Sequence, residues 1–361
     1  MTDGGKEMVG GHDSNSEPKK KPGKRWLFWV KLLSAVLLLL FLLHQNRLDL
    51  AVMGELVLEP WLVFGVVGMT MTVFLLAGFR WHLLLVSQEI PLSRMKAIQV
   101  TFIGMFFGLF LPGGLLGGDA LRVAYAIQAT KHNRGGAALS VLVDRAIGFY
   151  ALLLLGLVAA FLNPEAIMGN PPLRILAMIN LLLLVVGPVV GLLTLWLVWK
   201  SDRLRSFVWA NPDGLLQRIL SRAADAVKLY RRAIPLLFGA LGLSVLSQAL
   251  GIASVVLIGL STEGGVLAFL DYAFVTAWTL IANTIPLTPG GIGVGEAAFD
   301  QLCRWIEPMP SMIAYGSLFF VYRILTLGAA LPGFFAYLIY RNEVDAHLET
   351  GKMSEGGRGA S

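Results

Sequence analysis

The chain has 361 residues, of which 56% are hydrophobic and only 14% are charged. Soluble domains carry roughly 25% charged residues, so this composition indicates an integral membrane protein. The net charge of +6 lies mostly in loops and tails, where it indicates membrane topology and not nucleic-acid binding. A single cysteine, Cys303, excludes an internal disulfide bond.

The sequence lacks the motifs of the common enzyme classes. It contains no P-loop, no dinucleotide fingerprint and no nucleophile elbow, and its five histidines do not have metal-ligand spacing. We therefore expect no catalytic residue, no metal ion and no cofactor, and we do not expect an enzyme.

The two ends of the chain are polar. Residues 1–25 are rich in Gly, Ser and Lys, which predicts a disordered basic tail in the cytoplasm. The apolar run that follows is too long for a signal-peptide core and has no cleavage site after it, so we expect an uncleaved first helix. Residues 342–361 predict a short polar cytoplasmic tail.

Several apolar stretches approach or exceed the roughly 20 residues that cross a bilayer. The six candidates are 26–43, 61–79, 139–162, 173–199, 236–261 and 311–340. Two further stretches, 97–130 and 268–306, are each interrupted by a glycine motif. Residues 97–111 would form a helix of about 22 Å, shorter than a hydrocarbon core of about 30 Å. We therefore predict two re-entrant hairpins, each of which enters and leaves on one side.

Positive charge supports this topology when the N-terminus is placed in the cytoplasm. The inward segments then carry nearly all the Lys and Arg, and the outward loops are mainly acidic. If the hairpins were full spans instead, Arg122, Lys131 and Arg134 would lie outside. We expect both termini in the cytoplasm and the protein in a bacterial inner (plasma) membrane.

The crossings divide into two membrane repeats, residues 26–162 and residues 173–341. Each repeat has an odd number of crossings, so the second runs upside down relative to the first. The predicted fold is an all-α polytopic membrane protein with about six transmembrane helices and two re-entrant helical hairpins in an inverted repeat. Residues 200–235 have apolar residues at helical spacing with basic residues between them, which indicates either an amphipathic helix on the inner leaflet or a plain connection.

The glycine motif occurs once in each half. Residues 112–120 read PGGLLGGDA and residues 289–297 read PGGIGVGEA. Each copy is followed, one element later, by an arginine in an apolar helix, Arg145 and Arg323. Gly/Pro-broken apolar segments at matching places in two halves indicate a transporter binding site.

These hairpin tips have the chemistry to bind a phosphate. Glycine permits positive φ, backbone N–H groups at a tip have no helical partner, and a helix restarting at about Asp119 points its positive end at the tip. An arginine within a crossing helix is expected to face a partner or a cavity. The predicted substrate-binding residues are Pro112, Gly113, Gly114, Gly117, Gly118, Asp119, Arg122, Arg145, Asn283, Pro289, Gly290, Gly291, Gly293, Gly295, Glu296 and Arg323.

The same residues also fit structural roles, and these alternatives stay open. Asp119 and Glu296 stand where a helix N-cap or first-turn acid belongs. The glycines suit close helix packing. Arg145 is close enough to the inner interface to snorkel. The candidate acidic partners are Asp119 or Asp144 for Arg145, and Glu296 or Asp300 for Arg323.

Residues 111–122, 140–145 and 285–296 resemble the signature stretches of the lysylphosphatidylglycerol synthase transmembrane family, a flippase-like family of integral membrane proteins. The resemblance covers about residues 26–341. In that family, a membrane domain of this kind moves an aminoacylated lipid between leaflets, and a soluble domain behind it makes the lipid. Because the chain ends at Ser361, we expect a stand-alone member without the synthase domain.

The combined prediction is a lipid flippase or translocase for a phosphate-bearing head group, such as that of a phospholipid, an aminoacyl-lipid or a polyprenyl phosphate. A membrane lipid is then the expected partner, and a homo-oligomer is left open. The alternative is a non-transporting membrane subunit or regulator of a lipid-modifying or glycosyl-transferring enzyme, docked on residues 200–235. A membrane-embedded transferase or phosphatase is less favoured, because no general base or metal cluster supports it.

Overall fold

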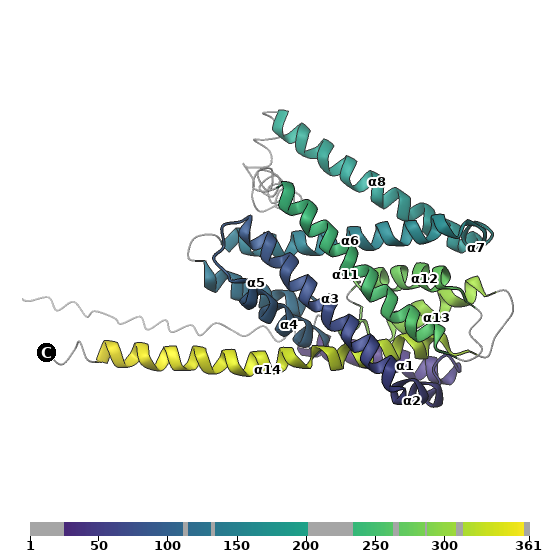
Figure 1. The fold of residues 1–361 in the computed structure, drawn as a ribbon, viewed down its shortest axis with the longest axis horizontal. Helices are drawn as coiled ribbons and strands as arrows, with labels where there is room; N and C mark the ends of the chain where they lie inside the picture. Colours follow the sequence, from purple (N-terminus) through teal and green to yellow (C-terminus); the bar gives the residue numbers. More distant parts are fainter. Residues whose placement is uncertain are drawn as a thin grey trace, which may run out of the picture.

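A computed structural model describes residues 25–110, 115–130, 134–200, 234–262, 267–285, 287–307 and 313–356. Within these segments the regular structure is entirely helical, as predicted (Figure 1). Three predicted features fall wholly or largely outside the described residues: the tail 1–25, the first glycine tip at Pro112, Gly113 and Gly114, and the amphipathic segment 200–235.

Long apolar helices make up most of the bundle. They are α1 (Arg25–His44), α3 (Pro60–Val86), α6 (Arg134–Leu162), α8 (Pro171–Lys200), α11 (Ile234–Leu260) and α14 (Tyr315–Gly356). Two short helices, α2 (Leu50–Leu58) and α7 (Pro164–Met168), lie at one end of the bundle (Figure 1). The last helix passes along the bundle and projects beyond it, so residues 342–356 continue α14.

Five of the long helices are long and apolar enough to cross a membrane. The qualifying segments are Pro60–Val86, Gly135–Leu162, Pro171–Val189, Pro235–Leu260 and Tyr315–Ile339. The remaining predicted crossing, residues 26–43, lies in α1, where Leu32–His44 forms a shorter apolar stretch of helix. Large apolar side chains on these helices face outward; for example, Leu181, Leu182 and Val185 on α8 are 49%, 57% and 52% exposed. Such apolar surface suits contact with lipid.

Both glycine motifs are flanked by short helices. α4 (Arg94–Phe110) and α5 (Leu115–Ala129) form hairpin 1, and α12 (Phe269–Ala282) and α13 (Val294–Ile306), joined by the 3₁₀ turn η3 (Pro289–Gly291), form hairpin 2. At 1.5 Å per residue these helices are about 20 to 26 Å long, below the roughly 30 Å of a hydrocarbon core. Both regions therefore have the short helices that the sequence predicts.

Close helix contacts make each hairpin an antiparallel pair. A Cβ on Gly118 would overlap the carbonyl of Gly104 and lie 3.2 Å from the Cα of Gly108, so α5 folds back along α4. In hairpin 2 the rings of Tyr272 and Phe299 stack with centroids 6.3 Å apart. The packing role that small residues have in membrane helices is thus present at Gly118.

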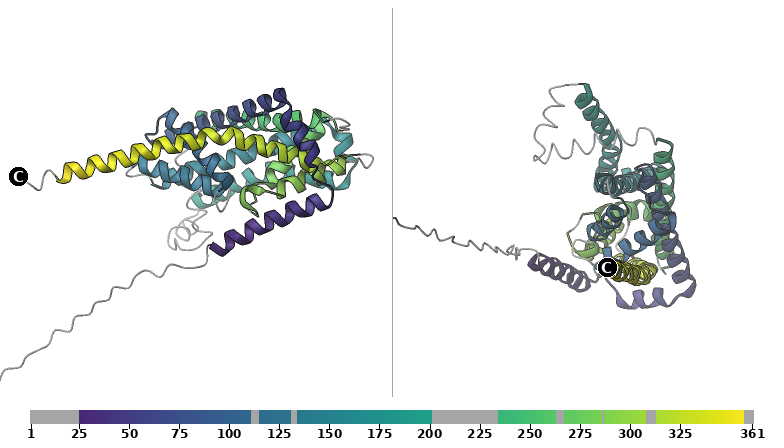
Figure 2. Two further views of the ribbon diagram at one scale, coloured as in Figure 1. Left: turned by 90° about the horizontal axis from the view of Figure 1, so that it is seen from below. Right: turned by 90° about the vertical axis from the view of Figure 1, so that its left-hand side faces the viewer.

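The helices of the two hairpins lie in opposite halves of the bundle (Figure 1), and the second tip lies against the C-terminal end of α4. At this meeting point a Cβ on Gly290 would lie 3.3 Å from the carbonyl oxygen of Leu109, next to the first tip. α1 lies along the side of the bundle and begins at the end from which α14 projects (Figure 2). Its Leu38 packs on Gly293, where a Cβ would come within 2.8 Å of the leucine side chain.

Replacing Gly118 by alanine is expected to destabilise hairpin 1 by roughly 1–3 kcal/mol, because the new methyl group overlaps backbone that cannot rotate away. The measurement is thermal unfolding in detergent. Gly68→Ala on α3 is the control, because a Cβ there meets nothing within 4 Å. That control should be neutral or slightly stabilising, since alanine favours helix over glycine. Equal stability of the two variants would contradict the close crossing.

Candidate functional site

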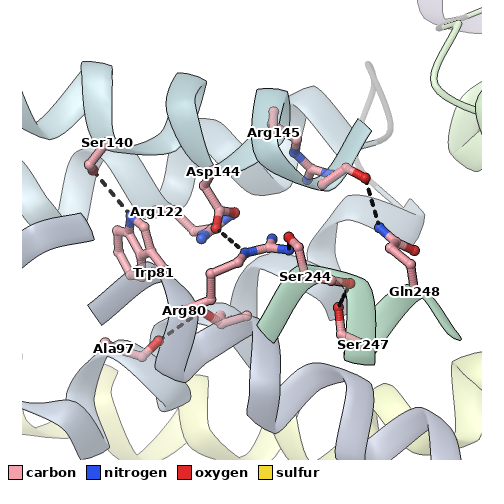
Figure 3. Close-up of polar contacts among 12 residues, drawn as sticks. Arg80, Trp81, Ala97, Arg122, Ser140, Asp144, Arg145, Ser244, Ser247 and Gln248 are labelled. Atoms are coloured by element: carbon pink, nitrogen blue, oxygen red, sulfur yellow. Dashed lines mark hydrogen bonds and ion pairs between the residues drawn. The ribbon is translucent and has the colours of Figure 1, made fainter. Parts of the chain in front are cut away.

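Five charged side chains from α3, α5 and α6 lie together at hairpin 1, and Figure 3 shows four of them. We call Arg80, Asp119, Arg122, Asp144 and Arg145 the arginine cluster. The other residues of these helices are largely apolar. Packing of the helices against one another therefore shields most of these charged side chains from water.

Asp144 is shared by two arginines. Arg80 donates from Nε to Oδ1 at 2.7 Å, and Arg122 donates from Nη1 to Oδ2 at 3.0 Å. Asp144 is 1% exposed. Arg80 also donates to the hydroxyl of Ser244 on α11 at 2.5 Å, which connects the cluster to a fourth helix (Figure 3).

Arg145 pairs with Asp119 and not with its neighbour Asp144. Its Nε and Nη2 donate to Oδ2 at 2.6 Å and to Oδ1 at 2.8 Å, a bidentate pair. Of the two roles left open for Asp119, the structure favours ion pairing over capping, because α5 already begins at Leu115 and the carboxylate is directed at Arg145. The Arg145 side chain is 38% exposed, so the cluster is accessible on this side.

Arg122 is the most deeply buried arginine of the cluster, at 2% exposure. It lies 4.5 Å from the ring centroid of Trp81, whose indole N–H donates to Ser140 at 3.1 Å. Besides Asp144, it approaches Asp119 at 3.4 Å. Its Nε and Nη2 have no hydrogen-bond partner among the described residues. Two strong donors are therefore buried with unused bonding capacity.

The arginine cluster carries a formal charge of +1, because three guanidinium groups face two carboxylates. Its cation–π contact with Trp81 offsets part of this excess. The remaining positive charge suits an anionic ligand. Planar guanidinium groups can bond to two oxygens of a phosphate or carboxylate at once.

At hairpin 2 the motif acid, Glu296, and the arginine of the following helix, Arg323, form a direct ion pair. Arg323 donates from Nε to Oε1 of Glu296 at 2.6 Å, which confirms Glu296 as the partner. The same guanidinium donates to the carbonyl oxygens of Gly290 at 2.5 Å and Gly291 at 3.0 Å. Glu296 is fully buried and also accepts from the Gly293 N–H at 2.8 Å, as a first-turn capping acid does. Its capping and ion-pairing roles therefore coexist.

The second tip does not present the ring of free N–H groups that the sequence predicts. Gly290, Gly291 and Gly293 have the expected positive φ of 61°, 71° and 84°. However, the N–H groups of Gly291 and Ile292 bond to the carbonyls of Thr288 and Pro289, while the tip carbonyls point at Arg323. The reason is that a tight turn satisfies its own donors. Arg323 thus fixes the shape of the tip.

Glycine at two positions of hairpin 2 makes room for Asn283. A Cβ on Gly291 or Gly295 would lie 2.5 or 2.7 Å from Asn283 Oδ1. Pro289 is buried in the same turn. In hairpin 1, Gly117 and Gly118 lie within α5 and not at its start. The predicted residues thus fall into two groups, one around the arginine cluster and one around the second tip.

Sequence reasoning missed Arg80 and Ser244. The sequence places Arg80 in an inward loop after a crossing that ends at 79, whereas α3 continues to Val86 and buries this side chain to 6% exposure. A basic residue followed by a further apolar run, WHLLLV, was the available signal.

Asp300 also differs from expectation, because it does not pair with Arg323. It is 1% exposed and pairs with Arg47 from the α1–α2 connection and with Arg304 Nε at 2.9 Å. Next to it, the Asp49 N–H donates to the Ser317 hydroxyl at 2.6 Å. These contacts join the α1–α2 connection to hairpin 2 and to the start of α14.

Replacing Arg323 by glutamine is expected to lower the free energy of unfolding by about 3–5 kcal/mol, because it leaves the buried Glu296 without a counter-charge. Adding Glu296→Gln should recover part of this loss, which a double-mutant cycle measures by denaturation in detergent. Arg174→Gln, at an exposed position on α8, serves as the control and should change little. Additive losses from the two single variants would contradict the pairing.

Comparison with known proteins identifies the family of the chain. No curated protein and no solved structure matches the chain significantly. The family model described as the lysylphosphatidylglycerol synthase TM region matches residues 28–333, which include both hairpins and every charged residue of the two sites. The chain is therefore an integral membrane protein that belongs to the lysylphosphatidylglycerol synthase TM region family.

Proposed function

We propose that the protein is a lipid translocase that moves a phosphate-bearing head group across the bilayer, with the arginine cluster as the head-group site. The observation that carries the proposal is the excess positive charge of this cluster, together with the two Arg122 nitrogens that lack a partner among the described residues. Membership of a lipid-associated membrane family supports the same substrate class.

Energetics favour an anionic ligand at this place. A buried donor without an acceptor costs roughly 1–3 kcal/mol, and an uncompensated charge within a membrane segment costs about as much or more. One phosphate diester carries a single negative charge and unshared oxygens that accept from guanidinium groups. Such a ligand would neutralise the cluster and use the unused donors of Arg122 in one step.

A lipid head group also fits the position of the cluster. Arg145 provides the accessible side, at 38% side-chain exposure, while Arg122 lies at the buried side, at 2%. A head group would meet Arg145 first and Arg122 last, and the acyl chains would stay in the surrounding lipid. In this proposal the second tip has a structural role, because Arg323 and Glu296 hold its shape next to Leu109 and hairpin 1.

We further propose that the two hairpins belong to an inverted-topology repeat. The positions of their helices in opposite halves of the bundle, with the second tip against the C-terminal end of α4, support this interpretation (Figure 1). The start of α1 and the end of α8 lie toward the end of the bundle from which α14 projects (Figures 1 and 2). The last residue of α8 is Lys200, and the first turn of α4 carries Arg94 and Lys96. Following the positive-inside rule, we propose that this end faces the cytoplasm of a bacterial inner membrane.

Transport, and not catalysis, is the proposed activity, with a membrane lipid as the partner. The alternative of a non-transporting subunit that docks an enzyme depends on residues 200–235, most of which lie outside the described residues. It therefore remains a prediction from the sequence.

The test uses purified protein in vesicles and dye-labelled lipids. Movement of labelled phosphatidylglycerol should fall about tenfold or more in Arg122→Gln and Arg145→Gln, since a hydrogen bond to a charged group contributes about 1.5–3 kcal/mol. A glycosyl-diacylglycerol with the same dye, which lacks phosphate, should not depend on these arginines. Arg174→Gln is the control variant.

Arg145→Gln keeps the test valid if Arg122→Gln does not fold, because the Arg145 side chain is partly exposed. Undiminished phosphatidylglycerol movement by a folded Arg145→Gln variant would overturn the proposed site. Equal loss for the phosphate-free lipid would overturn the phosphate as the recognised group.

A further inference from the structure

Helix α12 carries a line of polar side chains along one face. Tyr272, Thr276, Thr279 and Asn283 follow one another at intervals of four, three and four residues, which places them on the same side of a helix. We call these four residues the polar stripe. It extends about 16 Å along the helix axis, from the first turn of α12 to the tip of hairpin 2.

Three members of the polar stripe are fully buried, Asn283 is partly buried, and each of the four has a hydrogen-bonding group that is unused. Tyr272, Thr276 and Thr279 are each 0% exposed. The Tyr272 hydroxyl, both threonine hydroxyls and Asn283 Oδ1 have no hydrogen-bond partner among the residues that the structure describes. Each such group costs roughly 1–3 kcal/mol when nothing bonds to it.

Hydroxyls on other helices of the bundle show the usual alternative. Thr101 on α4 donates to the carbonyl of Ala97 at 2.8 Å, and Ser254 on α11 donates to that of Leu250 at 2.9 Å. This back-bonding to residue i−4 is a common way for a helix to satisfy a buried hydroxyl. Thr276 and Thr279 do not use it, so their hydroxyls are left for a partner outside their own helix.

The surroundings of the stripe supply few such partners. The ring of Tyr272 lies against Gly259 of α11, where a Cβ would be 2.7 Å from Cζ, and stacks on Phe299 of α13. Phe299 in turn stacks on Phe319 at 5.6 Å. The faces of the ring thus have apolar neighbours, whereas Asp271, Cys303, Glu307 and Tyr315 lie near its hydroxyl without bonding to it. At the inner end Asn283 contacts the second tip, beside the Glu296–Arg323 pair.

We propose that the polar stripe binds a file of water molecules that connects the first turn of α12 with the second tip. Buried waters typically make about three hydrogen bonds to polar groups that have no other partner, and four such groups one helical turn apart suit them. This inference concerns hairpin 2 alone and does not depend on the lipid or on the arginine cluster.

Hydroxyl-radical footprinting by X-ray radiolysis tests the proposal on the full-length protein in nanodiscs, because radicals generated from bound water modify adjacent side chains. Tyr272 should be oxidised at least fivefold faster than Phe274, an equally buried aromatic residue on the opposite face of α12. Thr276→Val together with Thr279→Val removes two water-binding groups at almost unchanged volume. That double variant should lower the oxidation of Tyr272 and leave Phe274 unchanged.

A dry stripe gives the opposite results. Tyr272 would then be oxidised as slowly as Phe274, and the Thr276→Val/Thr279→Val protein would unfold at a higher temperature, since it loses two unsatisfied polar groups. Either of these results would overturn the proposal. Because the readouts are oxidation and unfolding, they are independent of lipid movement.

Discussion

Burial of charge within apolar helices is the constraint on which this structure depends. Asp144 is 1% exposed and lies between Arg80 of α3 and Arg122 of α5. Separating these partners would leave a charge in a medium that solvates it poorly, so the pairs fix the register of three helices more strictly than apolar packing alone. Ser244 extends the same constraint to α11. The cluster is thus a structural centre as well as the proposed binding site.

Two similar sequence motifs take on different roles because their helices begin at different places. In hairpin 2, α13 begins at Val294, so Glu296 is in the first turn, where it caps the helix and pairs with Arg323. In hairpin 1, α5 begins at Leu115, so Asp119 lies more than a turn inside and is available to pair with Arg145. A shift of a few residues therefore converts a capping acid into part of a buried charge cluster.

The sequence predicts the helical class and the short hairpin helices, and it limits the partner of Arg323 to Glu296 or Asp300, because apolar run lengths and isolated charges carry that information directly. It does not predict Arg80, since a basic residue near the end of an apolar run looks like the end of the crossing. It also does not predict the carbonyls of Gly290 and Gly291 as acceptors for Arg323. Glycine spacing indicates a turn with positive φ, but the direction of its peptide groups depends on the side chains that the fold brings near.

Helix α1 and hairpin 2 are joined at two separate places. Leu38 packs on Gly293 at the second tip, and Arg47, nine residues later, pairs with Asp300 on α13. One attachment is within α1 and the other is in the connection just after its end, so the two together restrict rotation as well as sliding. Hairpin 2 is therefore tied to the N-terminal helix at both of these places, and a displacement of the second tip would have to break these contacts or move α1 with it.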